Sequence, residues 1–196
     1  LAFSPDFETL ASADSTGVIK VWRIQTGRCV RTYPSAHHGA ITKMEFSADG
    51  NGLLTSGFDG MARLHGLKSG KTLNAITSGP WVLKEVIKVD DKADTITFIA
   101  LGRIPGENPY HQHFCKVGLD GKDFVDLTPS DGHHEVIFSP DRRTLIDISS
   151  RVDQAPTYTL RSGIDGRAIA NLGAGDLTPL KKAGWTPAMP FVAKDR

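Results

Sequence analysis

The sequence predicts an all-β protein, a β-propeller of about four blades with four antiparallel strands in each. The first observation is a repeated motif: "FSPD" begins at Phe3 and at Phe138, and the near copy "FSAD" begins at Phe46. The intervals are 43 and 92 residues, the second close to twice the first. A period of about 40–50 residues is typical of propellers, whose blades repeat along the chain.

The other two observations are alternation and turn chemistry. Short runs in which apolar and polar residues alternate predict half-buried strands. The runs are separated by tight turns rich in glycine, which supplies the positive φ that hairpins need. These turns are Thr16-Gly17, Thr26-Gly27, Asp49-Gly50, Asp59-Gly60, Ser69-Gly70, Asp120-Gly121 and Asp165-Gly166.

Taken in order, the runs form four units of four strands. The first unit covers 1–4, 9–13, 18–24 and 28–33. The second covers 41–47, 52–58, 61–67 and 71–76. The third covers 82–89, 95–101, 111–119 and 123–128. The fourth covers 134–139, 144–150, 157–162 and 167–172. The repeated motif then ends the first strand of a blade and starts its turn, which makes its role architectural.

The expected organisation is two blades over residues 1–78, two more over 79–175, and a tail over 176–196 that caps an edge or stays loose. In this tail "DLTPLKKAG" begins with a capping residue, Asp176, and ends with Gly184, a pattern that favours a short helix. The 196 residues carry a net charge of +1, without the basic excess of a nucleic-acid binder. No apolar run is long enough to span a bilayer, and no signal peptide is evident, so no membrane partner is expected. Leu1 in place of Met indicates a trimmed start, so the compartment stays unknown. The two cysteines, Cys29 and Cys115, are expected to be buried free thiols.

The first half carries motifs of a known repeat family. The stretches "VIKVWRIQTGRCVR", "AHHGAITKMEFS" and "RLHGLKSGKTL" resemble WD40 repeats, in particular those of the spliceosomal WD-repeat protein that partners the RED splicing factor. The resemblance implies a hydrogen-bonded tetrad of a loop His, a turn Asp, a strand Ser and a strand Trp. His37 matches the loop His and Asp59 the turn Asp. The Trp position holds Trp22 in the first unit and His65 in the second, so the tetrad is incomplete.

The second half carries motifs of a different family. "SGPWVL", "NPYHQHFCKVGLDG", "LTPSDGHHEVIFSPD" and "SSRVDQAP" resemble the N-terminal propeller of bacterial dipeptidyl peptidase IV-like enzymes of the prolyl oligopeptidase family. "AGWTPAMPFVAKD" resembles the segment that leads into their hydrolase domain. Two propeller types joined near Ser78-Gly79 predict a designed or recombined chimera, with a gene-prediction or assembly error as the alternative.

No catalytic residues, cofactor or metal ligands are predicted. The Gly-x-Ser-x-Gly elbow of these hydrolases is missing, and so is their paired-glutamate segment, since Glu107 and Glu135 stand alone. His111, His113 and Cys115 alternate along one strand face and can be imagined as zinc ligands, but backbone hydrogen bonds are the favoured interpretation for strand histidines.

The stretch "SRVDQAP" supplies two weak ligand candidates, Arg151 and Asp153. Pairing of the two charges across a loop is favoured over ligand binding.

The sequence therefore favours a non-catalytic propeller, a chimeric scaffold that associates with itself or with another protein. The alternatives are an accessory, substrate-gating propeller fragment of a dipeptidyl peptidase IV-like serine peptidase, and a spliceosomal interaction module. Open blades expose strand edges, which must be satisfied. Either four blades close into a ring by packing alone, or two chains form a homodimeric ring of eight blades.

Overall fold

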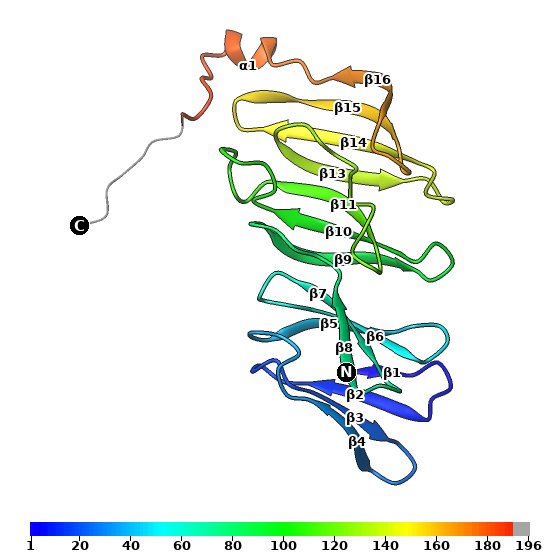
Figure 1. Cartoon of the computed structure of the whole chain (residues 1–196). Helices are drawn as coiled ribbons and strands as arrows, with labels where there is room; N and C mark the ends of the chain where they lie inside the picture. Colours follow the sequence, from blue (N-terminus) through cyan, green and yellow to red (C-terminus); the bar gives the residue numbers. More distant parts are fainter. Residues whose placement is uncertain (190–196) are drawn as a thin grey trace, which may run out of the picture.

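The computed structural model describes residues 1–189, whose strands form four separate antiparallel sheets (Figure 1). The first sheet contains β1 (Ala2–Phe3), β2 (Thr9–Ala13), β3 (Ile19–Arg23) and β4 (Arg28–Tyr33). The second contains β5 (Ile41–Phe46), β6 (Gly52–Gly57), β7 (Ala62–Gly66) and β8 (Lys71–Ala75). The third contains β9 (Val82–Asp90), β10 (Thr95–Leu101), β11 (Gln112–Gly118) and β12 (Val125–Asp126). The fourth contains β13 (His133–Phe138), β14 (Thr144–Arg151), β15 (Gln154–Ser162) and β16 (Ala168–Ala174).

Each sheet is built by consecutive strands that pair in chain order, as a propeller blade requires. The alternation behind the strand predictions is visible in β3, where Ile19 and Val21 are buried and Lys20 between them is exposed. The predicted all-β fold, with four propeller-like blades of four strands, is confirmed.

The repeated motif forms the same turn each time. Ser4, Ser47 and Ser139 follow the last residue of β1, β5 and β13. In each case the serine Oγ accepts the backbone N–H of the residue five positions later, over 2.9 Å at Ser4, 2.8 Å at Ser47 and 3.1 Å at Ser139. The motif therefore closes the first hairpin of three blades.

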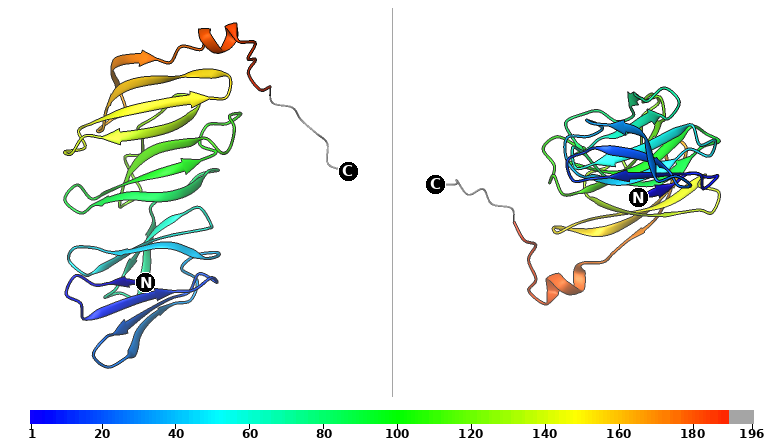
Figure 2. Two further views of the ribbon diagram at one scale, coloured as in Figure 1. Left: turned by 180° about the vertical axis from the view of Figure 1, so that it is seen from behind. Right: turned by 90° about the horizontal axis from the view of Figure 1, so that it is seen from below.

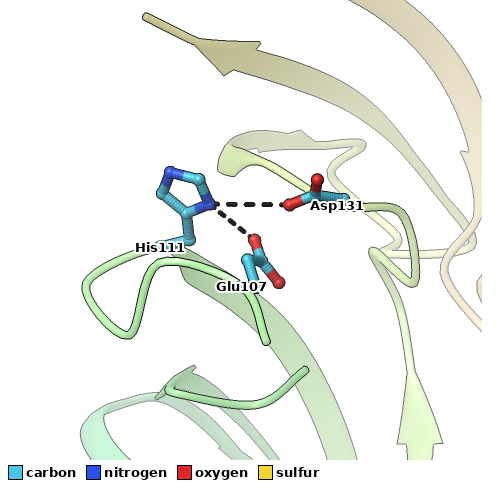
Figure 3. A group of neighbouring side chains, drawn as sticks. All are labelled: Glu107, His111 and Asp131. Atoms are coloured by element: carbon cyan, nitrogen blue, oxygen red, sulfur yellow. Dashed lines mark hydrogen bonds and ion pairs between the residues drawn. The ribbon is translucent and has the colours of Figure 1, made fainter. Parts of the chain in front are cut away.

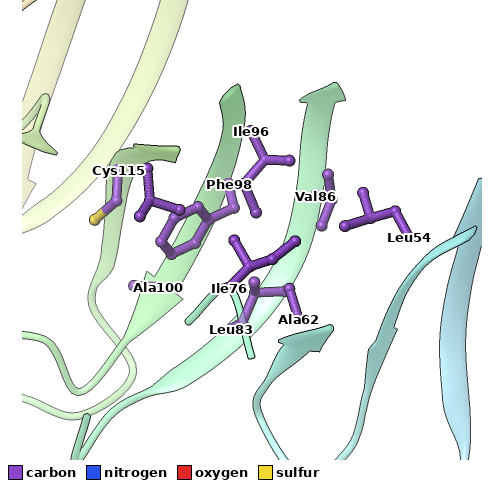
Figure 4. Packing of buried hydrophobic residues seen from close by; sticks show 10 residues of the cluster. Leu54, Ala62, Ile76, Leu83, Val86, Ile96, Phe98, Ala100 and Cys115 are labelled. Carbon is purple, nitrogen blue, oxygen red and sulfur yellow. The ribbon is translucent and has the colours of Figure 1, made fainter. Parts of the chain in front are cut away.

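Three hydrophobic cores fill the spaces between neighbouring sheets. Between the first and second sheets lie Ala11, Ile19, Val21, Tyr33, Ala36, Phe46 and Leu53. Between the second and third lie Leu54, Ala62, Ile76, Leu83, Val86, Ile96, Phe98, Ala100, Cys115 and Val117 (Figure 4). Between the third and fourth lie Ile99, Phe114, Leu127 and Leu145. The middle core takes residues from both sides of Ser78-Gly79, so the two halves share one packed interface.

The sheets are stacked in chain order, and the first and fourth lie at opposite ends of the stack (Figures 1 and 2). Each sheet packs only against its neighbours in the sequence. The described residues therefore form an open stack, not a ring of four blades closed by packing within one chain.

The chain continues after β16 into the predicted short helix, α1 (Thr178–Lys182). The N-cap residue is Leu177, one position after the predicted Asp176, whose side chain accepts the backbone N–H of Thr178 over 2.8 Å. The turn ends at Gly184, whose φ is 85°. No residue of α1 is buried. Residues 190–196 of the expected tail lie outside the described residues. Nothing helical within residues 1–189 has the length and apolar character needed to cross a membrane.

Candidate polar site between the third and fourth sheets

Polar side chains gather around Glu107, where the third sheet meets the fourth. Glu107 and His111 lie in the connection between β10 and β11, and His113 lies in β11. Asp131 comes from the connection that enters the fourth sheet at β13. Figure 3 shows the ring of His111 directed toward the carboxylates of Glu107 and Asp131.

The Glu107 carboxylate is the centre of this cluster. Its Oε1 accepts the backbone N–H of Gly132 over 2.9 Å and lies 2.6 Å from His111 Nδ1. Its Oε2 lies 3.0 Å from His113 Nε2. The Glu107 side chain is only 4% exposed. Burial opposes its ionisation, but the Gly132 amide and the His111 ring outweigh burial and hold the pKa of Glu107 below its usual value.

Local turn chemistry brings His111 back onto Glu107. The Asn108 side chain accepts the backbone N–H of Tyr110 over 3.0 Å, and the Asn108 carbonyl accepts the N–H of His111 over 3.0 Å. Such Asx turns reverse the chain within a few residues. The two side chains, four positions apart in sequence, therefore meet at hydrogen-bonding distance.

Asp131 is held by the two candidates from "SRVDQAP". Arg151 donates to both oxygens of Asp153, from Nε over 2.9 Å and from Nη2 over 2.8 Å, and its Nη1 pairs with Asp131 Oδ2. Each of the three guanidinium nitrogens thus donates to a carboxylate, and in this arrangement the Arg151–Asp153 pair positions Asp131.

A second buried network lies beside the first. His134 Nδ1 lies 2.7 Å from Asp147 Oδ1, and His134 Nε2 lies 2.7 Å from the Ser130 carbonyl oxygen. Arg161 donates from Nε to Asp147 Oδ2 over 2.7 Å. Both nitrogens of His134 therefore lie against acceptor oxygens, one from a carboxylate and one from the backbone. The ring centroid of His134 is 5.0 Å from that of His113, which joins the two networks.

The tetrad candidates are divided between two sheets. His37, in the connection between β4 and β5, packs on the second sheet: its Nδ1 lies 2.8 Å from Asp59 Oδ1, and its Nε2 lies 2.7 Å from Thr55 Oγ1. The same hydroxyl lies 2.9 Å from His65 Nε2. Trp22 belongs to the first sheet, where it donates from Nε1 to Ser12 Oγ over 2.8 Å.

Sequence reasoning missed several contributors to these sites, among them Asp131, Asp147 and Arg161. It treated Glu107 as an isolated residue, although the neighbouring Asn108-Pro109 turn was a signal that the chain doubles back there. It also left out Thr55, which occupies the position of the expected strand Ser, and Arg63, which donates to Asp59 over 2.6 Å. Both lie on alternating strand positions that periodicity alone does not mark as polar partners.

The His-x-His-x-Cys row does not converge on one point. His111 and His113 both reach Glu107, but the Cys115 thiol is buried and donates to Asp126 Oδ1 over 3.5 Å. Burial, and then the charge of Asp126, raises the pKa of this thiol. Cys115 therefore does not join His111 and His113 at Glu107. The other cysteine, Cys29, was expected to be buried, but it is exposed because it lies on β4 of the first sheet.

A surface groove occurs elsewhere, between the second and third sheets, with a volume of about 510 Å³. Leu64, Asn74, Asp94 and Asp120 are among its lining residues. None of the residues of the polar networks described above lines this groove.

The fold and the site define a class: an open β-propeller array whose polar clusters are buried between blades and joined mainly to each other and to the backbone. The chain belongs to the family described as the dipeptidyl peptidase IV (DPP IV) N-terminal region, whose family model matches residues 14–156. A second family model, the WD domain with G-beta repeat, matches residues 1–23. The two resemblances drawn from the sequence, to WD40 repeats and to the peptidase propeller, are confirmed at this level.

Curated relatives are WD-repeat proteins. The chain is 32% identical to Periodic tryptophan protein 2 of Arabidopsis thaliana over 78 residues, which cover 40% of this chain and 9% of the relative. It is 39% identical to Transducin beta-like protein 3 of Bos taurus over 72 residues, which cover 35% of this chain and 9% of the relative. The chain thus spans about a tenth of the length of these relatives.

Proposed function

We propose that the chain is a non-catalytic binding module that associates with a second copy of itself through the outer faces of its first and fourth sheets. The observation that carries the proposal is that both terminal sheets have an apolar face with no sheet packed on it. Inner faces of the same sheets are filled by the cores described above. WD40 and propeller domains in general serve as protein-interaction surfaces, which supports the binding role.

The outer face of the first sheet has an apolar row across its strands. Phe3 pairs with Leu10, Leu10 with Trp22, and Trp22 with Cys29. Residues directly opposite one another in a sheet point to the same face. Phe3 is 57% exposed, whereas its neighbour on the other face, Ala2, packs on the inner core.

The outer face of the fourth sheet has a matching row. Ile137 pairs with Ile146, Ile146 with Leu160, and Leu160 with Ala170. Ile137 is 58% exposed, whereas Leu145, one position from Ile146, is buried in the inner core. Uncovered sheet faces of this kind are typical of association surfaces.

A pair of copies satisfies both faces at once. If the fourth sheet of each copy packs on the first sheet of the other, eight blades form a closed ring with twofold symmetry. Each new interface then repeats the blade-to-blade packing that already joins neighbouring sheets in the chain.

The mass in solution, measured by light scattering coupled to size exclusion, tests the proposal. We expect about twice the 21.2 kDa of one chain. Phe3→Lys and Ile137→Lys, one on each face, should shift the mass to that of one chain. Val152→Lys is the matched control, since Val152 is 72% exposed but lies in the β14–β15 turn. A single-chain mass for the unsubstituted protein, or a broad profile of higher masses, would contradict the two-copy ring.

A second candidate follows from the family match over residues 14–156. In this case the chain is an accessory propeller that orients peptides for a serine peptidase domain. Titration with short peptides that have a free amino terminus, followed by NMR, should then perturb resonances, and N-acetylated peptides should not. Equal perturbation by both kinds of peptide, or none, would argue against this role.

The proposed chimeric origin rests on the two kinds of repeat. The WD-repeat match at residues 1–23 and the peptidase propeller match support two parents. The peptidase family model also runs across Ser78-Gly79, so the place of the join rests on the sequence motifs alone. Sequencing of the source genome through these codons checks the proposal, and an uninterrupted natural reading frame there would rule out a designed join.

A further inference from the structure

We propose that Glu107, His111 and Asp131 form a binding site for a divalent transition-metal ion such as Zn²⁺, which joins the third sheet to the fourth. One ligand atom from each residue lies within 4.8 Å of the others. Two carboxylates and one imidazole are a donor set that zinc and its neighbours bind. This inference stands independently of self-association.

The distances agree with a shared ion. Ligands bound tetrahedrally at about 2.0–2.1 Å are separated from one another by about 3.3 Å. His111 Nδ1 lies 2.6 Å from Glu107 Oε1 and 3.8 Å from Asp131 Oδ1. These two separations lie on either side of the required value, and the Glu107 and Asp131 oxygens lie within 4.8 Å of each other, so side-chain rotations can bring the three atoms around one ion.

The hydrogen bonding around His111 Nδ1 also calls for a cation. This nitrogen carries at most one proton, and it faces two carboxylates. The proton serves Glu107 at 2.6 Å, which leaves Asp131 Oδ1 at 3.8 Å, beyond hydrogen-bonding distance. A metal ion in place of that proton satisfies the nitrogen and both carboxylates together.

Neighbouring residues already hold the two proposed carboxylate ligands, Asp131 and Glu107, in place. Arg151 holds Asp131 through Oδ2 and leaves Oδ1 directed at the site. Gly132 N–H and His113 hold Glu107 from the protein side. Metal-binding carboxylates are commonly oriented by such partners, which fix the ligand atoms before the ion arrives.

The site remains open on one side. Glu107 is almost fully buried, but the side chains of His111 and Asp131 are 17% and 48% exposed. Three protein ligands with an open position leave room for a water molecule in the coordination sphere. Because the ligands come from the connections that flank β11 and precede β13, a bound ion links two blades and stabilises their packing.

Titration of the full chain with Co²⁺, after treatment with a chelator, is the test. We expect one equivalent to bind with the visible absorption bands of low-coordinate Co²⁺, and Zn²⁺ to displace it and raise the melting temperature. His111→Gln and Asp131→Asn should weaken Co²⁺ binding by about 10–100-fold or more. His38→Gln, at an exposed histidine, is the matched control and should bind like the unsubstituted chain.

Two results would overturn the proposal. One is a chain that takes up no Co²⁺ or Zn²⁺ while circular dichroism shows it folded. The other is that the His111→Gln variant, shown by circular dichroism to be folded, binds Co²⁺ as tightly as the His38→Gln control. In that case other residues would hold the ion.

Discussion

His37 Nε2 and Thr55 Oγ1 lie 2.7 Å apart in the interior of the second sheet, and the same hydroxyl lies 2.9 Å from His65 Nε2. A hydroxyl can donate one hydrogen bond while it accepts another. With His37 donating from Nδ1 to Asp59, its Nε2 accepts the Thr55 proton, and Thr55 in turn accepts from His65. One threonine therefore connects two buried rings.

Replacement of this threonine should be costly. Thr55→Val keeps the shape of the side chain but leaves two buried ring nitrogens without a partner, so we expect the free energy of unfolding to fall by about 1–3 kcal/mol. Urea denaturation measures this change. Thr32→Val, at an exposed position of β4, is the control and should change stability by less than about 0.5 kcal/mol. Equal effects at the two positions would contradict the shared hydrogen bond.

The buried rings should make stability depend on pH. Burial, and then the nearby His37 and Arg63, lowers the pKa of His65 from 6.5 to about 4. The pKa of His37 is lowered by its burial as well. Between these pH values the unfolded chain binds a proton that the folded chain does not, so the free energy of unfolding falls as the pH falls from 6.5 to about 4.

The slope in this window should reach about 1.4 kcal/mol per pH unit from His65 alone. Denaturation across the window in the unsubstituted chain and in His65→Gln measures it. The variant should be less stable at neutral pH and should show a shallower slope, because one of the titrating groups is gone. An unchanged slope in the variant would mean that other residues govern the pH dependence.

The backbone conformation of the repeated turn predicts opposite effects on stability for Phe7→Gly and Gly50→Ala. The position after each "FSPD" or "FSAD" has positive φ, 57° at Phe7 and 68° at Gly50. Left-handed backbone costs about 1–2 kcal/mol for residues other than glycine. Phe7→Gly should therefore stabilise the protein by about 1 kcal/mol, less the small loss of its contact with Phe3.

Gly50→Ala is the converse substitution and should destabilise the protein by a similar amount. A Cβ at Gly50 would meet only the Pro5 ring, 3.9 Å away, so crowding does not obscure the effect. Thermal melts of the two variants show whether each substitution raises or lowers the stability. Stabilisation by Gly50→Ala would show that φ does not limit this turn.

The Asp147 network predicts that replacing this buried aspartate costs much more stability than replacing an exposed one. The Asp147 side chain is 1% exposed and faces both His134 and Arg161. Asp147→Asn removes the negative charge that pairs with the largely buried Arg161 guanidinium, so a loss of about 3–5 kcal/mol is expected. Asp141→Asn, whose partner Arg143 is exposed at the surface, should change the stability far less. Chemical denaturation of both variants checks the contrast, which similar losses would refute.

Much of the fold is predictable from local pattern. Strands such as β3 are marked by alternation, and the turns by glycines such as Gly60 and Gly121, because both signals depend only on residues close in sequence. The short helix after Asp176 was predicted for the same reason.

The cluster around Glu107 could not be predicted in this way. Asp131 reaches it from another sheet, and its orientation depends on Arg151, which lies twenty positions farther along the chain. Such contacts depend on how blades pack, and periodicity carries no information on that packing. The open stack could not be predicted from the sequence either, because ring closure depends on the angles between blades.

The stacking of the sheets also determines where local unfolding begins. The second and third sheets are covered on both faces, whereas the first and fourth each have one face in water as a single chain. Fewer contacts must break to release a terminal sheet, so fraying proceeds inward from both ends. Amide hydrogens of β2 and β14 should accordingly exchange with deuterium faster than those of β6 and β10, and a partner on the end faces would remove this gradient.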